Sequence, residues 1–169
     1  MTVKSLDRDE LRELLVKCWM THDGMWFYQC KQEYGIDAAN RLNRAAIKSL
    51  APVEVHRVAK ALGIKGKEIE TFDGLKAVID GMFQTIKGDF MDFTFEYPEE
   101  NVLRWEMDRC FALEGMKMIG ASEQYECGVL YRVFCWFDEL GLKYRVEPPV
   151  EGCLMRDTGS CTGIVRFEF

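Results

Sequence analysis

The spacing of apolar residues changes its period once along the chain, near residue 90. Before that point apolar residues recur every three to four positions, which is typical of amphipathic helices. The first helix is predicted to begin at Asp7, because Asp7 and Glu10 have the spacing of a capping box. The pattern is interrupted at Thr21-His22-Asp23-Gly24, so the sequence predicts a break there and a new helix from Met25 to Tyr34.

Three further helices are predicted before the period changes. One runs from Asp37 to Leu50, and the next begins at Pro52, because proline suits the first turn of a helix. Residues 64–70 are polar and are expected to form a loop. The last of these helices has the clearest apolar stripe of the chain, which consists of Phe72, Leu75, Val78, Ile79, Met82, Phe83 and Ile86.

Beyond residue 90 apolar and polar residues alternate, which predicts half-buried strands. The predicted strands cover residues 93–97, 103–107, 144–146 and 161–169, and two helices, 110–120 and 122–140, separate the second strand from the third. The short turn between the first two strands requires an antiparallel hairpin. The sequence therefore predicts an α+β fold, in which a helical N-terminal half packs on a four-stranded antiparallel sheet with ββααββ order. A single domain is expected, with a helical part at 1–88 and a ββααββ part at 89–169.

Composition and charge exclude several classes of partner. The chain is 48% hydrophobic and 30% charged, as in soluble globular proteins, and it carries a net charge of −6. An acidic chain without a run of Lys or Arg argues against nucleic acid and against an anionic membrane surface. There is no signal-peptide core and no apolar run of about 18 residues, so we expect a cytoplasmic protein with no membrane partner. No feature specifies an oligomeric state.

The cysteines are the strongest candidates for chemistry. Five of the seven lie between Cys110 and Cys161. In a reducing compartment they are expected as free thiols or metal ligands rather than disulfides. Cys127 and Cys135 lie eight residues apart on one predicted helix. That spacing corresponds to about 12 Å of rise, too far for both to bind one ion. The predicted ligands for zinc or another divalent transition metal are therefore Cys110, Cys127, Cys153 and Cys161, all near the ends of elements.

A second interpretation of these cysteines remains open. Free cysteine is among the most buried residue types, and the chain has no C-x-x-C pair, which is the stronger zinc signature. Candidate catalytic residues are His22, which lies beside a carboxylate and can act as a general base, and Glu114. Alternatively, Asp23 caps the following helix and His22 only fills a turn. Phosphate-binding loops and a G-x-S-x-G elbow are absent from the sequence.

Two stretches carry a resemblance to a known family. Residues 22–27 (HDGMWF) together with 33–39 (EYGIDAA) resemble the opening of an uncharacterised prokaryotic domain family with spaced cysteines. That family is similar to the L-2-amino-thiazoline-4-carboxylic acid hydrolase-like proteins. Its cysteines begin a helix after a strand, open the next helix, precede the final hairpin and lie in the last strand. These positions match Cys110, Cys127, Cys153 and Cys161, so the resemblance implies a thiol or metal site and, by analogy, hydrolysis.

Three functional hypotheses follow. The first is a cytosolic protein that binds a metal through clustered cysteines. The second is a metal-dependent hydrolase of a small heterocyclic or amide substrate, with His22 or Glu114 as the base. The third is a sensor domain that binds a small-molecule ligand in an apolar pocket between its helices and its sheet.

Overall fold

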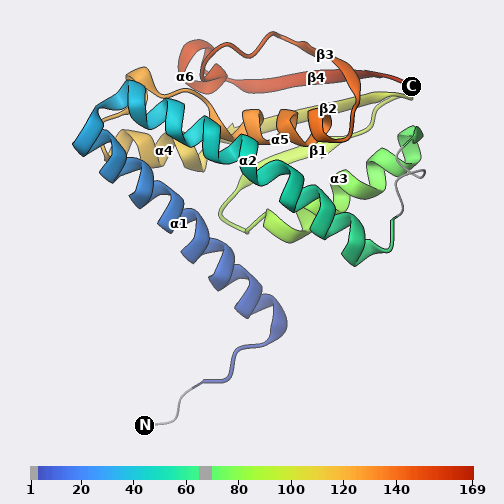
Figure 1. Cartoon of the computed structure of the whole chain (residues 1–169), viewed down its shortest axis with the longest axis horizontal. Helices are drawn as coiled ribbons and strands as arrows, with labels where there is room; N and C mark the ends of the chain where they lie inside the picture. Colours follow the sequence, from blue (N-terminus) through green and yellow to red (C-terminus); the bar gives the residue numbers. More distant parts are fainter. Residues whose placement is uncertain (1–3, 65–69) are drawn as a thin grey trace.

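The computed structural model describes residues 4–64 and 70–169, so most of the loop predicted at 64–70 lies outside the described residues. Figure 1 shows a sheet with most of its helices gathered on one side. In chain order the elements are α1 (Arg8–Tyr34), α2 (Ile36–Leu62), α3 (Phe72–Ile86), β1 (Asp92–Glu96), β2 (Val102–Arg109), α4 (Phe111–Met118), the 3₁₀ turn η2 (Ser122–Gln124), α5 (Gly128–Glu139), β3 (Lys143–Glu147), α6 (Leu154–Thr158) and β4 (Cys161–Glu168).

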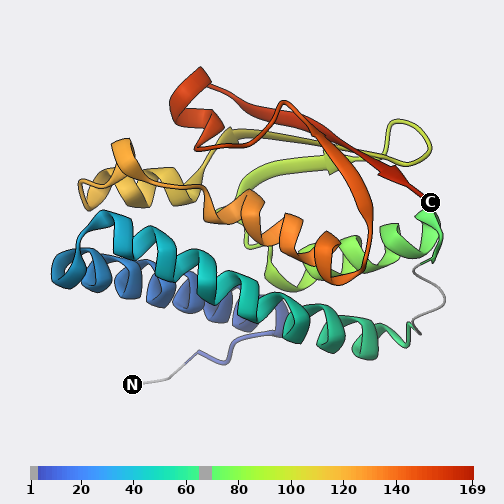
Figure 2. The ribbon, with the colours of Figure 1, turned by 45° about the horizontal axis from the view of Figure 1, so that its top comes forward.

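The elements form layers (Figure 2). The hairpin of α1 and α2 forms the outer layer, and α5 lies between α2 and the sheet. The strand order is β1-β2-β4-β3, and all three neighbouring pairs are antiparallel. The predicted α+β fold with a four-stranded antiparallel sheet is confirmed.

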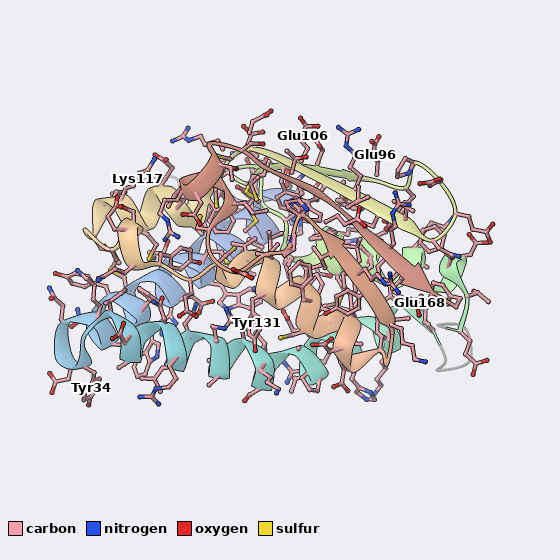
Figure 3. All side chains as sticks on the ribbon, turned by 90° about the horizontal axis from the view of Figure 1, so that it is seen from above. Tyr34, Glu96, Glu106, Lys117, Tyr131 and Glu168 are labelled. Atoms are coloured by element: carbon pink, nitrogen blue, oxygen red, sulfur yellow. The ribbon has the colours of Figure 1, made fainter. Side chains whose placement is uncertain are left out.

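The alternation of β2 sets the two faces of the sheet. Leu103, Trp105 and Met107 are buried against the helices, and Arg104 and Glu106 point outward. Figure 3 shows Glu106 projecting from the outer face of the sheet, away from the helices. Opposite Trp105 in the register lies Gly163, where an added Cβ would stand 2.2 Å from the indole ring. Glycine at this position therefore makes room for the tryptophan.

The core lies between α3, α5 and the sheet. The α3 and α5 helices and the sheet all supply the most deeply buried large side chains, which are Trp136, Phe137, Leu75, Ile79, Met82, Val78 and Val165. Four of them belong to the apolar stripe predicted for residues 72–86, which is confirmed as α3. Among the described residues, no helix is both long enough and apolar enough to cross a membrane.

The predicted break at residues 21–24 is wrong, because α1 continues from Arg8 to Tyr34. The capping box of Asp7 and Glu10 at its start is confirmed. Thr, His, Asp and Gly are weak helix formers, but each costs no more than about 1 kcal/mol, which packing along α2 can offset. Asp23 therefore caps no helix, and His22 lies in no turn.

Three further boundaries also differ from the predictions. Pro52 lies inside α2, where the neighbouring Ala51 and Val55 are buried, so tertiary packing holds the helix together across the proline. The helix predicted at 122–140 begins only at Gly128, after the short turn η2. Residues 154–158, for which the sequence pattern predicts no helix or strand, form the short helix α6.

Candidate functional site

The four predicted ligand cysteines all lie at the ends of elements. Cys110 is the N-cap of α4, Cys127 the N-cap of α5 and Cys153 the N-cap of α6, while Cys161 is the first residue of β4. All four are buried, with exposures between 3% and 8%. The N-cap residue of each of these three helices is therefore a buried cysteine. Figure 3 shows sulfur atoms, in yellow, gathered near α6.

The structure brings these four thiols together. Burial, with smaller contributions from the nearby thiols of Cys110, Cys153 and Cys161, raises the pKa of Cys127 to about 12. Burial likewise raises the pKa of Cys161 to about 11, again with contributions from Cys110 and Cys153. The pKa of Cys110 is raised by burial and by Cys153. Each thiol of this cysteine cluster is thus an electrostatic neighbour of the other three.

Hydrogen-bond donors point at the sulfur atoms of the cluster. The backbone N–H of Leu113 donates to Cys110 Sγ at 3.5 Å, as expected for an N-cap side chain. A backbone hydrogen bond from Leu130 lowers the pKa of Cys127, opposing the larger effect of burial. Such N–H groups at the start of a helix favour a thiolate over a thiol.

Trp105 contributes a further donor from the sheet. Its side chain is 6% exposed, and among the described residues its indole N–H has no acceptor at standard hydrogen-bond geometry. The same N–H lies close enough to Cys161 to lower the pKa of that thiol. Buried donors without an acceptor are rare, so this indole marks the cluster as a place suited to negative charge.

Tyr125 is a buried neighbour of the cluster. Its hydroxyl accepts a hydrogen bond of 3.0 Å from the backbone N–H of Gly128, in the first turn of α5. Burial raises the pKa of Tyr125 above its usual range, and Cys127 adds to the increase. The phenol therefore stays neutral beside the thiols.

The cluster does not have ligand geometry. Within residues 4–64 and 70–169, no group of three or more His, Cys, Asp or Glu side chains stands close enough together to hold a metal ion. Four thiolates on one zinc ion would lie about 3.8 Å apart. The cysteine cluster is therefore a gathering of buried thiols, and their role as metal ligands stays a prediction.

The two candidate catalytic residues lie in different surroundings. The side chain of His22 is 79% exposed on α1, and its Nδ1 lies 3.8 Å from the carboxylate of Asp23. Glu114 lies in the first turn of α4 and forms an ion pair of 2.9 Å with Lys117, which lowers its pKa. Glu114 also raises the pKa of Cys110. The structure thus places Glu114 near the cysteine cluster and His22 on an exposed helix surface.

The sequence pattern does not predict the buried ion pair of Arg132 and Glu54. Arg132 on α5 donates from Nε to Glu54 Oε2 at 3.0 Å and forms a second bond to Oε1, and Trp136 donates to the same carboxylate at 3.0 Å. The guanidinium lies 4.7 Å from the ring of Trp19. Arg132 is a lone cation within the inward stripe of an apolar helix, and that position is the sequence signal that could have revealed it.

The profile of a family of unknown function, DUF6125, matches residues 4–128 of the chain. The match covers more than half of the sequence. The chain belongs to this family. No curated protein and no solved structure matches the chain. The DUF6125 match includes Cys110 and Cys127 and ends before Cys153 and Cys161. Membership of an uncharacterised family is thereby shown, and a link to the thiazoline hydrolase-like proteins is not.

Proposed function

We propose that the protein binds one zinc-type transition-metal ion through Cys110, Cys127, Cys153 and Cys161. The observation that carries this proposal is the gathering of four buried thiols from four separate elements, each an electrostatic neighbour of the other three. A closed set of four thiolates is the usual arrangement of a structural site, so the metal would stabilise the fold rather than catalyse a reaction.

The surroundings of the cluster support a metal over inert thiols. Buried cysteines that serve only as small apolar side chains do not need donors directed at them. Here backbone N–H groups of α4 and α5 and the indole of Trp105 point at sulfur. Groups of this kind stabilise the ligands of metal sites. Since burial keeps the free thiols protonated, a metal ion would bind by displacing their protons and drawing the sulfur atoms into ligand geometry.

The test is metal analysis of the reduced protein, purified without added metal, followed by titration of the metal-free protein with Co²⁺ and Zn²⁺. We expect one ion per chain and the absorption bands of tetrahedral cobalt thiolate. Cys127→Ser should weaken Zn²⁺ binding by at least about 100-fold, because it removes a ligand. Cys135→Ser is the matched control: Cys135 is also buried on α5, but it is not among the thiols that shift the pKa of Cys127. Equal effects of the two substitutions, or no bound ion, would reject the proposal.

The resemblance to thiazoline hydrolase-like proteins supports a catalytic variant of this proposal. Catalysis requires three protein ligands and an open position on the metal. Glu114, which influences Cys110, is then the better placed base, and His22 the other candidate. Hydrolysis of L-2-amino-thiazoline-4-carboxylate by the zinc-loaded protein, lost in Glu114→Gln, would establish this variant. If the zinc-loaded protein lacks this activity, the catalytic variant is rejected and the structural role of the metal stands.

A further inference from the structure

A pocket of about 200 Å³ lies beside the cysteine cluster: Tyr125 lines it, but none of the four ligand cysteines does. Its walls are largely apolar and come mainly from α1, α4 and α5, with smaller contributions from α2, α3 and β1. The larger apolar side chains that line it include Phe27, Phe83, Phe93, Phe111, Met116 and Trp136. A cavity of about 150 Å³ holds a benzene molecule, so this pocket has room for an aromatic ring with a short chain attached.

Two helical glycines keep this pocket open. Gly24 of α1 and Gly115 of α4 both line it, and a Cβ added at either position would meet no atom within 4 Å. Neither has a positive φ, so backbone conformation does not demand glycine. Gly81 and Gly128 differ from these two. A Cβ added at Gly81 would stand 2.3 Å from Leu62, and one added at Gly128 would stand 2.9 Å from Asn43. Since glycine weakens a helix relative to alanine, the open space at Gly24 and Gly115 is retained at a cost in stability.

The position of Gly24 on its helix shows where a larger side chain would go. Met20, Asp23 and Phe27 also line the pocket, and they lie four residues before, one before and three after Gly24 in α1. Residues three or four positions apart share one face of a helix, so Met20, Gly24 and Phe27 lie on the face toward the pocket and Asp23 borders that face. A side chain at residue 24 would therefore enter the pocket.

The charged residues of the pocket favour a cation. Asp23 stands at its edge with 51% of its side chain exposed, and burial of the remainder raises its pKa, although Arg132 and His22 act in the opposite direction. Arg132 also lines the pocket, but its charge is paired with Glu54. Asp23, Glu54 and Arg132 together carry one net negative charge. Aromatic side chains also attract cations through their ring faces.

We propose that this pocket binds a small organic cation: an amine whose ammonium group pairs with Asp23 and whose ring-sized apolar body lies between Phe27 and the opposite wall. The assignment goes beyond metal binding and does not depend on it. The same room would admit a neutral or an anionic aromatic molecule, so charge is the property to test.

The test titrates the full chain with three probes of similar shape, 2-phenylethylamine, 2-phenylethanol and 3-phenylpropionate, at pH 7.5. Binding is followed by chemical shift changes in two-dimensional NMR spectra. Ligands of this size reach affinities of about 1 mM. We expect saturable binding of the amine, weaker binding of the alcohol and the weakest binding of the acid. If the alcohol or the acid binds as tightly as the amine, or the amine does not saturate by about 10 mM, the proposal is wrong.

Variants then connect the binding to the pocket. Asp23→Asn should weaken amine binding by at least about fivefold and leave the alcohol unchanged. Gly24→Leu should abolish binding of every probe by filling the pocket, and Gly115→Leu serves as a second filling variant if the first does not fold. The controls are Glu33→Gln and Thr21→Leu, at exposed positions of α1. Binding that survives both filling variants would overturn the assignment. Metal content measured on the same samples separates this outcome from failure of the metal site.

Discussion

Glu54 and Arg132 are a buried charged pair. Their side chains are 10% and 11% exposed, and they lie on different helices, 78 residues apart in the chain. The carboxylate accepts two hydrogen bonds from the guanidinium and one from Trp136. A buried pair of this kind contributes little net stability while intact, but removing one partner leaves the other as an uncompensated buried charge.

Glu54→Ala should therefore lower the free energy of unfolding by about 3–5 kcal/mol. Urea denaturation at pH 7 measures this change. The matched control is Glu99→Ala, because Glu99 forms an exposed ion pair of 3.0 Å with Arg166 and should contribute less than about 1 kcal/mol. A loss below about 1 kcal/mol for Glu54→Ala would show that Arg132 finds solvent when its partner is removed.

At the scale of the element, α1 continues through residues 21–24, although their sequence predicts the end of a helix. Its buried residues are Val16, Phe27 and Cys30, whereas the apolar side chains of Leu11 and Leu15 are exposed. The face that α1 turns inward beside the pocket includes Asp23 and Gly24. Two of the four residues that look like a break in the sequence, Asp23 and Gly24, therefore line a cavity.

Gly24→Ala and Gly115→Ala should each raise the free energy of unfolding by roughly 0.5–1 kcal/mol, because alanine suits a helix better and its methyl group meets open space. Thermal or urea unfolding would measure this. Gly81→Ala provides the contrast, since its Cβ would stand 2.3 Å from Leu62 Cδ1 and should destabilise α3. Destabilisation by Gly24→Ala would mean that the space beside α1 is filled.

At the scale of the whole molecule, the cysteine cluster joins the starts of α4, α5 and α6 to the start of β4. The four elements that carry these thiols are separated in the sequence. They are connected in space by the sheet and by the helices that pack on the sheet. The protonation of the cluster therefore affects the stability of the entire fold.

The metal-free, reduced protein should lose stability as the pH rises above about 8.5. In the unfolded chain the thiols ionise near that pH, whereas burial raises the pKa of Cys161 to about 11 and that of Cys127 to about 12 in the folded protein. The folded state then holds more protons than the unfolded state, so the free energy of unfolding falls between about pH 8.5 and 12. Urea denaturation at pH 7.5 and 10 with a chelator would measure the decrease.

Zinc should oppose this trend, since bound thiolates have already lost their protons and metal affinity increases with pH. Stability measured at the same two pH values with equimolar zinc should therefore fall less or increase. Cys127→Ser is the control in metal-free protein, because it removes one of the titrating thiols and should reduce the slope. A metal-free protein whose stability is the same at both pH values would contradict the raised thiol pKa values.

Much of the fold follows from local patterns alone. The period-2 segments predicted the four strands, and the apolar stripe at residues 72–86 predicted α3, because alternation and helical periodicity are properties of consecutive residues. The capping box at Asp7 and the helix start after Cys110 were local signals of the same kind. The positions of the cysteines at element ends also made their gathering foreseeable, although not its geometry.

Contacts between distant parts of the chain decided what the sequence by itself did not. Packing along α2 carries α1 through residues 21–24, and burial around Pro52 holds α2 together, although local propensity favours an end at both places. The pair of Glu54 and Arg132 and the pocket beside Gly24 depend on which helix faces meet. Sequence periodicity shows that a helix has an apolar face, but the neighbour that covers this face, and any space left between them, is set by tertiary packing.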